Sequence, residues 1–152
     1  MSQTSISLYQ PASFKGMLAD LSRSNDVMSY AAEEAIPFSL PVKLGTSPEK
    51  EVLKTTSGAL TIGFALAAHG VEKSSAGVAQ WGLTDTVPVL KSGRMWVETT
   101  DAVVAGAVAN LTVATGKLTD EAVAAGIEAF TKISVRFITG TTGAGLAMIE
   151  VK

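Results

Sequence analysis

The stretch of residues 85–97 constrains the fold more than any other part of this sequence. Both ends of the stretch are rich in β-branched and aromatic residues, which favour extended strands. Between them, Lys91-Ser92-Gly93 places a glycine last, where a three-residue hairpin loop requires a positive φ. The stretch therefore predicts two short antiparallel strands joined by a tight turn.

Other short apolar segments, each bounded by turn residues, predict further strands. Residues 60–66 are the best candidate for a buried strand, and Gly63 within them indicates a β-bulge or a close backbone approach. Residues 36–38 and 41–44 each contain a proline, which cannot donate to a central ladder, so we expect them near a sheet edge. Towards the end of the chain, apolar and polar side chains alternate on both sides of a glycine-rich turn, over residues 133–137 and 147–151.

The sequence between these strands carries weaker signals. Residues 102–115 are rich in alanine and valine, and the valines and threonines favour a strand. Thr119 is placed to cap a short helix that has Asp120 and Glu121 in its first turn and ends at Gly126. Short strands at regular intervals, separated by turns, predict a mainly β domain over residues 26–152, either a small sandwich or a barrel-like fold.

Residues 1–25 differ from the rest because they are rich in serine and glutamine. Within them, four apolar side chains follow the i, i+3, i+4, i+7 spacing of one helix face, with Ser13 as the N-cap: Phe14, Met17, Leu18 and Leu21. So short a helix needs a surface to dock on. Two interpretations stay open, a helix packed on its own domain or an N-terminal arm that reaches a neighbouring subunit.

Composition and charge exclude several classes of protein. Hydrophobic residues make up 47% of the chain, which argues against global disorder. The 12 basic and 14 acidic residues form no basic stripe, so we expect no nucleic-acid partner. The longest nearly apolar run, residues 59–68, is shorter than the roughly 20 residues that a membrane-spanning helix needs, so we expect no membrane partner. The first seven residues do not resemble a secretory signal.

Residues that carry chemistry are sparse. The chain has no cysteine and one histidine, His69, which leaves few ligands for a metal site. Residues 140–145 resemble a phosphate-binding loop in their glycines, but they lack the Gly-Lys-Ser/Thr ending and a following helix. The neighbouring acids Glu33 and Glu34 read as solvated loop charges rather than as a general acid and base. We therefore expect no enzyme activity, no cofactor, no metal and no small-molecule substrate.

Several segments resemble the structural cement (head decoration) proteins of tailed phages. The segments that carry the resemblance are Ile36-Pro37-Phe38, Gly63-Phe64-Ala65, Val87-Pro88-Val89-Leu90, Gly93-Arg94-Met95-Trp96-Val97 and the closing Gly145-Leu146-Ala147-Met148-Ile149-Glu150-Val151. The likeness covers residues 36–152. The serine-rich residues 1–25 and the helix start at Thr119 have no counterpart in it.

The resemblance implies a structural virion protein, often a trimer, on the outside of the capsid at junctions between major capsid proteins. Its role would be to hold the expanded shell against the pressure of the packaged DNA. The implied partners are the major capsid protein and other copies of the chain, and assembly would take place in the host cytoplasm. Another virion component, such as a tail or head-fibre subunit, and a small ligand-binding β-barrel remain alternatives.

Candidate binding residues follow from side-chain type and position. The apolar face of Phe14, Met17, Leu18 and Leu21 is the candidate arm contact. Arg94 and Trp96 belong to residue types that are enriched at interface hot spots. We expect Arg94 to be exposed at the tip of the predicted hairpin, whereas for Trp96 we favour a place in the core over a place in an interface.

Overall fold

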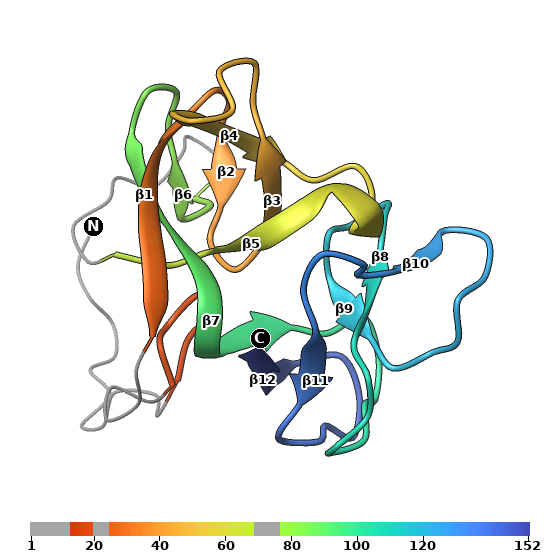
Figure 1. The fold of residues 1–152 in the computed structure, drawn as a ribbon. Coiled ribbons are helices and arrows are strands. Elements are labelled where there is room, and N and C mark those ends of the chain that lie inside the picture. Colours follow the sequence, from red (N-terminus) through yellow and green to blue (C-terminus); the bar gives the residue numbers. More distant parts are fainter. Residues whose placement is uncertain (1–12, 20–24, 69–76) are drawn as a thin grey trace, which may run out of the picture.

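The structure is a computed structural model that describes residues 13–19, 25–68 and 77–152 (Figure 1). The described residues are almost entirely strands and loops, with a single 3-10 turn, η1, at Gly58–Leu60. The strands are β1 (Asp26–Ala32), β2 (Ile36–Pro37), β3 (Pro41–Leu44), β4 (Glu51–Lys54), β5 (Thr61–Ala65), β6 (Gln80–Trp81), β7 (Thr86–Glu98), β8 (Asn110–Thr112), β9 (Leu118–Thr119), β10 (Ile127–Ala129), β11 (Val135–Phe137) and β12 (Leu146–Val151).

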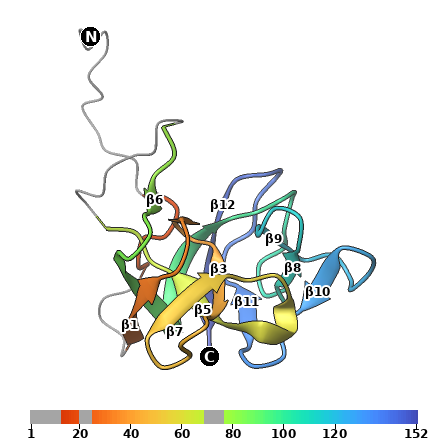
Figure 2. The same ribbon diagram turned by 90° about the horizontal axis from the view of Figure 1, so that it is seen from above.

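Five of the described strands close into a barrel in the order β1-β4-β3-β5-β7, because β7 pairs back onto β1 (Figures 1 and 2). The pairing of β1 with β4 is parallel, and the other pairings in the barrel are antiparallel. Every barrel strand contributes to one buried cluster, to which the short β2–β6 pair adds Ile36 and Trp81. The prediction of a mainly β, barrel-like domain is therefore confirmed.

The predicted hairpin within residues 85–97 is wrong, because β7 is one continuous strand of 13 residues. Its first half pairs with β1 and its second half with β12. Asp26 faces Ser92 while Val27 faces Leu90, so Lys91 is an extra residue in the ladder. Gly93 follows with a φ of 140°. The turn-forming residues thus build a β-bulge, which bends a strand without ending it.

This bulge changes which core the side chains of β7 enter. Before it, Val89 belongs to the barrel cluster and Leu90 to a second cluster, as expected for neighbours that point to opposite faces. After it, the odd-numbered Met95 and Val97 join Leu90 in the second cluster, which an unbroken alternation would not allow. One strand therefore serves both cores of the molecule.

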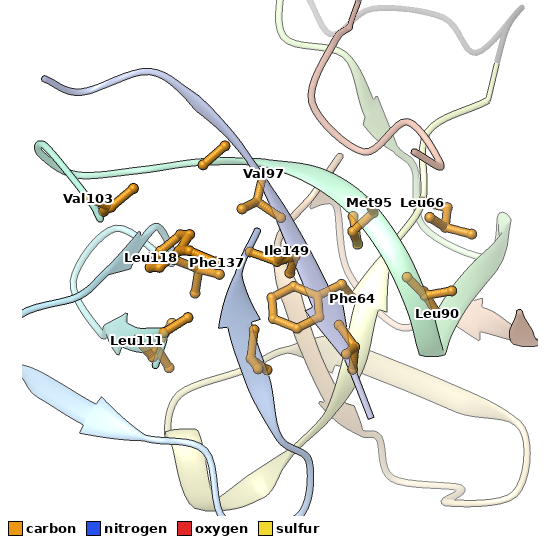
Figure 3. Close-up of a cluster of buried hydrophobic side chains, with 14 residues drawn as sticks. Phe64, Leu66, Leu90, Met95, Val97, Val103, Leu111, Leu118, Phe137 and Ile149 are labelled. Atoms are coloured by element: carbon orange, nitrogen blue, oxygen red, sulfur yellow. The ribbon is translucent and has the colours of Figure 1, made fainter. Parts of the chain in front are cut away.

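The second core lies between the barrel and the C-terminal half of the chain (Figure 3). Phe64 of β5 lies near Ile149 of β12, and Phe137 of β11 lies beside Leu118 of β9. The ring of Phe64 also meets that of Phe130 edge to face, with centroids 5.7 Å apart. The strands β8, β9 and β10 form a small separate sheet that covers this core.

The strand predictions for β5 and β12 are confirmed. At Gly63, an added Cβ would lie 2.4 Å from the carbonyl oxygen of Leu90, which is the close approach that the glycine indicated. The expectation that residues 41–44 lie near a sheet edge is wrong, because β3 pairs with both β4 and β5. Pro41 fits there because it is the first residue of its strand.

Two further predictions fail in the C-terminal half. Of residues 102–115, Asn110–Thr112 form the strand β8, and residues 102–108 form a loop. The helix from Thr119 to Gly126 is absent, since residues 120–126 also form a loop. The hydroxyl of Thr119 does accept a bond from the amide of Glu121, as a cap would, but the Asp120 carboxylate is occupied by the amide of Val104.

Candidate functional site

The described part of the N-terminal region, residues 13–19, lies against β7 of its own chain. The amide of Gly16 donates to the carbonyl of Trp96 at 2.8 Å, and the amide of Trp96 donates to the carbonyl of Met17 at 2.9 Å. A third bond joins the amide of Ala19 to the carbonyl of Arg94 at 2.9 Å. Residues 16–19 thus act as a short added strand beside the second half of β7, and we call residues 13–19 the docked segment.

The helix predicted to begin after Ser13 is not formed in the docked segment. Gly16 has a φ of 82°, and its carbonyl accepts a bond from the amide of Ala67 at 2.8 Å. The peptide groups of Gly16 therefore bond β7 on one side and the residues that follow β5 on the other.

The structure brings together part of the predicted apolar face. Phe14, Met17 and Leu18 are half-buried and line a shallow groove with Leu66, Ala67 and Pro88. Leu18 also packs against the second core and forms a bridge with Met95. Leu21 lies outside the described residues.

Arg94 and Trp96 lie on the outer face of β7, beside the docked segment. Arg94 is half-buried within a strand, so the expected position at a hairpin tip is wrong. Its guanidinium bonds the carboxylate of Glu150 on β12 at 3.3 Å. Trp96 is half-buried opposite Met148, so the favoured place in the core is wrong. Two predicted site residues therefore share one surface with the docked segment.

Sequence reasoning did not select two of the three most exposed large apolar residues of the described chain. Val104 and Val123 lie on the loops 102–108 and 120–126, which were predicted to be a strand and a helix. The signal that could have found them is the run of small apolar residues without a charge, as in Ala-Val-Ala-Ala-Gly at 122–126. Such a run is equally typical of a buried strand, so the sequence alone does not separate the two.

The acidic groups with altered pKa values hold loops in place. Hydrogen bonds from Ser57, and then from the amide of Gly58, lower the pKa of Glu128. Bonds from the side chain and amide of Thr46 lower the pKa of Glu33 in the same way. Over residues 13–19, 25–68 and 77–152, no three His, Cys, Asp or Glu side chains are grouped as a metal site would require. His69 lies outside the described residues.

Within the same described ranges, no helix has the length and hydropathy needed to cross a membrane.

The barrel fold of this chain also occurs in a solved structure. A chain of the solved structure described as the capsid of Myoviridae phage XM1 superposes with a TM-score of 0.71, over 98% of this chain and 96% of that one. The two sequences are 13% identical, so this likeness establishes a shared fold. No curated protein matches the chain in sequence.

The family is established by the sequence. Residues 2–152 match the family described as structural cement protein (E217 gp24/Pam3 gp6). The chain therefore belongs to the structural cement protein family, which confirms the resemblance of residues 36–152. The match also includes the N-terminal region, for which we expected no counterpart. It is a structural, capsid-associated protein of the phage virion.

Proposed function

We propose that this protein is a homotrimeric cement protein on the exterior of the expanded phage capsid. It binds at junctions between major capsid proteins and stabilises the shell against the pressure of the packaged DNA, after assembly in the host cytoplasm. The observation that carries the proposal is the family match over residues 2–152, together with a fold shared with a phage capsid chain.

The composition supports a protein that is covered by partners. Charged residues make up 17% of the chain, below the roughly 25% that is usual for soluble globular domains. A closed symmetric oligomer presents the same contact several times, and each contact after the first forms within an already bound complex. A trimer can therefore hold a shell firmly even when one contact alone is weak.

We propose that the outer face of β7 and the docked segment form the contact between copies. The side chains assigned to it are Phe14, Met17, Leu18 and Leu21 of the N-terminal region with Arg94 and Trp96 of β7. The described members of this set are half-buried in the single chain, so they have further surface to bury. An aromatic and an arginine beside an apolar groove are typical anchors of an interface.

Binding is tested by co-sedimentation of the purified protein with empty shells of its own phage, before and after expansion. The proposal predicts saturable binding to expanded shells and none to unexpanded ones. Equal binding to both would contradict recognition of the expanded surface, and the absence of binding to either would contradict a place on the capsid.

Two truncations test the role of the docked segment. Removal of residues 1–12 leaves its bonds to β7 intact, whereas removal of residues 1–19 takes them away. We expect the longer deletion to give a folded chain of lower oligomeric mass that binds shells more weakly, because it loses the repeated contacts. Unchanged co-sedimentation and unchanged mass of the longer deletion would refute this role.

A further inference from the structure

Three loops lie at the end of the molecule away from β2 and β6 (Figure 1). The loops 102–108 and 140–145 adjoin each other, and the loop 120–126 begins beside Val104 and then projects away. We call residues 102–108, 122–126 and 140–145 the loop surface.

Most residues of the loop surface are exposed, and none of them carries a charge. Charged side chains lie directly at their edges: Asp120 and Glu121 precede the loop of Val123, and the guanidinium of Arg136 bonds the carbonyl of Gly106 at 3.3 Å. The side chains of Val104 and Val123 are among the most exposed large apolar groups described, at 67% and 61%. Both views show the loop between β9 and β10 projecting from the body (Figures 1 and 2).

The loops are held in place by bonds that converge on Asp101. Its carboxylate accepts a bond from the hydroxyl of Thr119 at 3.1 Å, and its carbonyl accepts one from the hydroxyl of Thr141 at 3.3 Å. The loops 102–108 and 140–145 are also bridged directly, because the amide of Thr141 donates to the carbonyl of Val103 at 2.9 Å.

The loop that carries Val123 is fixed at its start. The carboxylate of Asp120 accepts a bond from the amide of Val104 at 2.8 Å, so the first loop is tied to the second. The side-chain amide of Asn110 donates to the carbonyl of Glu121 at 2.7 Å. The loops that carry the exposed valines are thus held by hydrogen bonds to each other and to the rest of the chain. Little conformational entropy is then lost in these loops when a partner binds.

The surface also contains a shallow groove. Small side chains and main chain line it, from residues 103–105 on one side and 140–145 on the other. Four of the lining residues are Gly140, Gly143, Ala144 and Gly145, which lets another backbone approach closely. With the projecting loop 120–126, this end of the molecule has a shape that the surface of another protein can contact.

We propose that the loop surface is the face that docks onto the major capsid protein, an inference that rests on the proposed function. Its own residues are small and mostly apolar, which suits a protein partner with an apolar surface. Its size argues for a contact that works only when linked copies bind several sites at once, and a shell offers such repeated sites whereas a single second copy does not. Side chains this small expose roughly a few hundred Å² of apolar area, while a stable dimer needs about 800 Å² from each partner. A contact of this size is effective where several copies are linked and bind together.

The test compares Val104→Glu/Val123→Glu with the wild type and with Leu83→Glu. Leu83 is 64% exposed on the turn before β7, outside the loop surface, and it is a matched control for adding a charge to an exposed apolar site. Each protein is titrated against expanded shells in co-sedimentation. Thermal unfolding and light scattering of the free proteins report fold and oligomeric mass.

We expect the double variant to bind at least about tenfold more weakly, because two charges would lose water in the contact, while Leu83→Glu stays within about twofold of the wild type. Fold and mass should be unchanged in both variants. Wild-type affinity of the double variant would overturn the inference alone. Loss of binding together with a lower oligomeric mass would also overturn it, since the loop surface would then join copies. Failure of the wild type to bind would overturn the proposed function and this inference with it.

Discussion

Arg94 and Glu150 face each other across the paired strands β7 and β12, and two guanidinium nitrogens of Arg94 lie 3.3 Å from one carboxylate oxygen of Glu150. Lys152 reaches the other oxygen at 3.4 Å. This small network joins the strand that serves both cores to the last strand of the chain, on the surface that also holds Trp96.

The first prediction concerns the strength of this pair. The two side chains keep 27% and 16% of their surface exposed, so water screens their attraction. Arg94→Ala should reduce the free energy of unfolding by less than about 1 kcal/mol in urea denaturation. A double-mutant cycle with Glu150→Gln isolates the pair, and a coupling above about 2 kcal/mol would contradict the account.

A second prediction addresses the docked segment. At Gly16, φ is 82° and an added Cβ would lie 2.9 Å from the amide nitrogen of Ala67. Gly16→Ala should therefore release the segment and speed the hydrogen exchange of the Trp96 amide, which the carbonyl of Met17 now protects.

Gly126→Ala is the matched control for Gly16→Ala, since its φ is 83° and no atom lies within 4 Å of an added Cβ. Gly126→Ala has the cost of an alanine at a positive φ, about 1 kcal/mol, without a close contact of the added Cβ. Equal exchange of the Trp96 amide in both variants would show that the contact with Ala67 does not hold the segment.

Closure of the barrel leads to a third prediction. An added Cβ at Gly63 would lie 2.4 Å from the carbonyl oxygen of Leu90, and a backbone atom in a paired strand has little room to move. Gly63→Ala should cost more than about 2 kcal/mol of unfolding free energy. Gly143→Ala, with no atom within 4 Å, should cost much less, and similar losses in urea denaturation would contradict the packing described.

The fourth prediction is a pH dependence. The pKa of Glu128 is lowered because its carboxylate accepts bonds from the Ser57 hydroxyl at 2.7 Å and the Gly58 amide at 2.8 Å. A lowered pKa in the folded state gives stability that is present above the ordinary glutamate value of about 4.3 and is lost as the pH falls through the folded value.

Glu128→Gln should therefore flatten the fall in Tm between about pH 6 and pH 3. Because Glu33 also has a lowered pKa, through Thr46, some dependence should persist in this variant. The double variant Glu33→Gln/Glu128→Gln should be flatter still. A wild-type pH profile in the double variant would contradict the assignment.

A fifth prediction follows from the uncharged loop surface. Shell binding through it should survive about 1 M NaCl, where charges more than about 3 Å apart are screened. The measurement is retention of the protein on expanded shells after a salt wash. Release at this salt concentration would indicate that charged groups elsewhere carry the attachment.

Local patterns predicted the segments in which the residue types themselves reflect the surroundings. The alternation in Leu146–Val151 identified β12 because one face of that strand is buried and the other is not. Gly63 was recognised because only a residue without a Cβ fits against a neighbouring strand. In both cases the residue types indicate the surroundings: a buried face along β12, and a close neighbouring backbone at Gly63.

The sequence was less informative where tertiary contacts decide the conformation. Lys91-Ser92-Gly93 has the chemistry of a turn, and the chain continues as a strand because β1 and β12 supply pairing on either side of the bulge. Likewise, Asp120 would favour the start of a helix, but its carboxylate bonds the distant Val104. The partner that decides each outcome lies far away in the chain, so a local pattern does not contain it.

The candidate site was predicted in part for the same reason. Arg94 and Trp96 were selected by type, and the structure places them beside Phe14, Met17 and Leu18 through the pairing of the docked segment with β7. The loop surface has residue types that are common in cores, and its exposure depends on bonds between distant residues: Asp101 with Thr119 and Thr141, and Asp120 with Val104.

The central claim is that this protein stabilises the filled capsid, and the most direct test is the temperature at which heads release their DNA. DNA-filled heads assembled without the protein are heated alone, with the wild type added back, and with Val104→Glu/Val123→Glu added back. The account predicts that the wild type raises the release temperature in a saturable way and that the double variant does not. An unchanged release temperature at saturating wild-type protein would contradict the account.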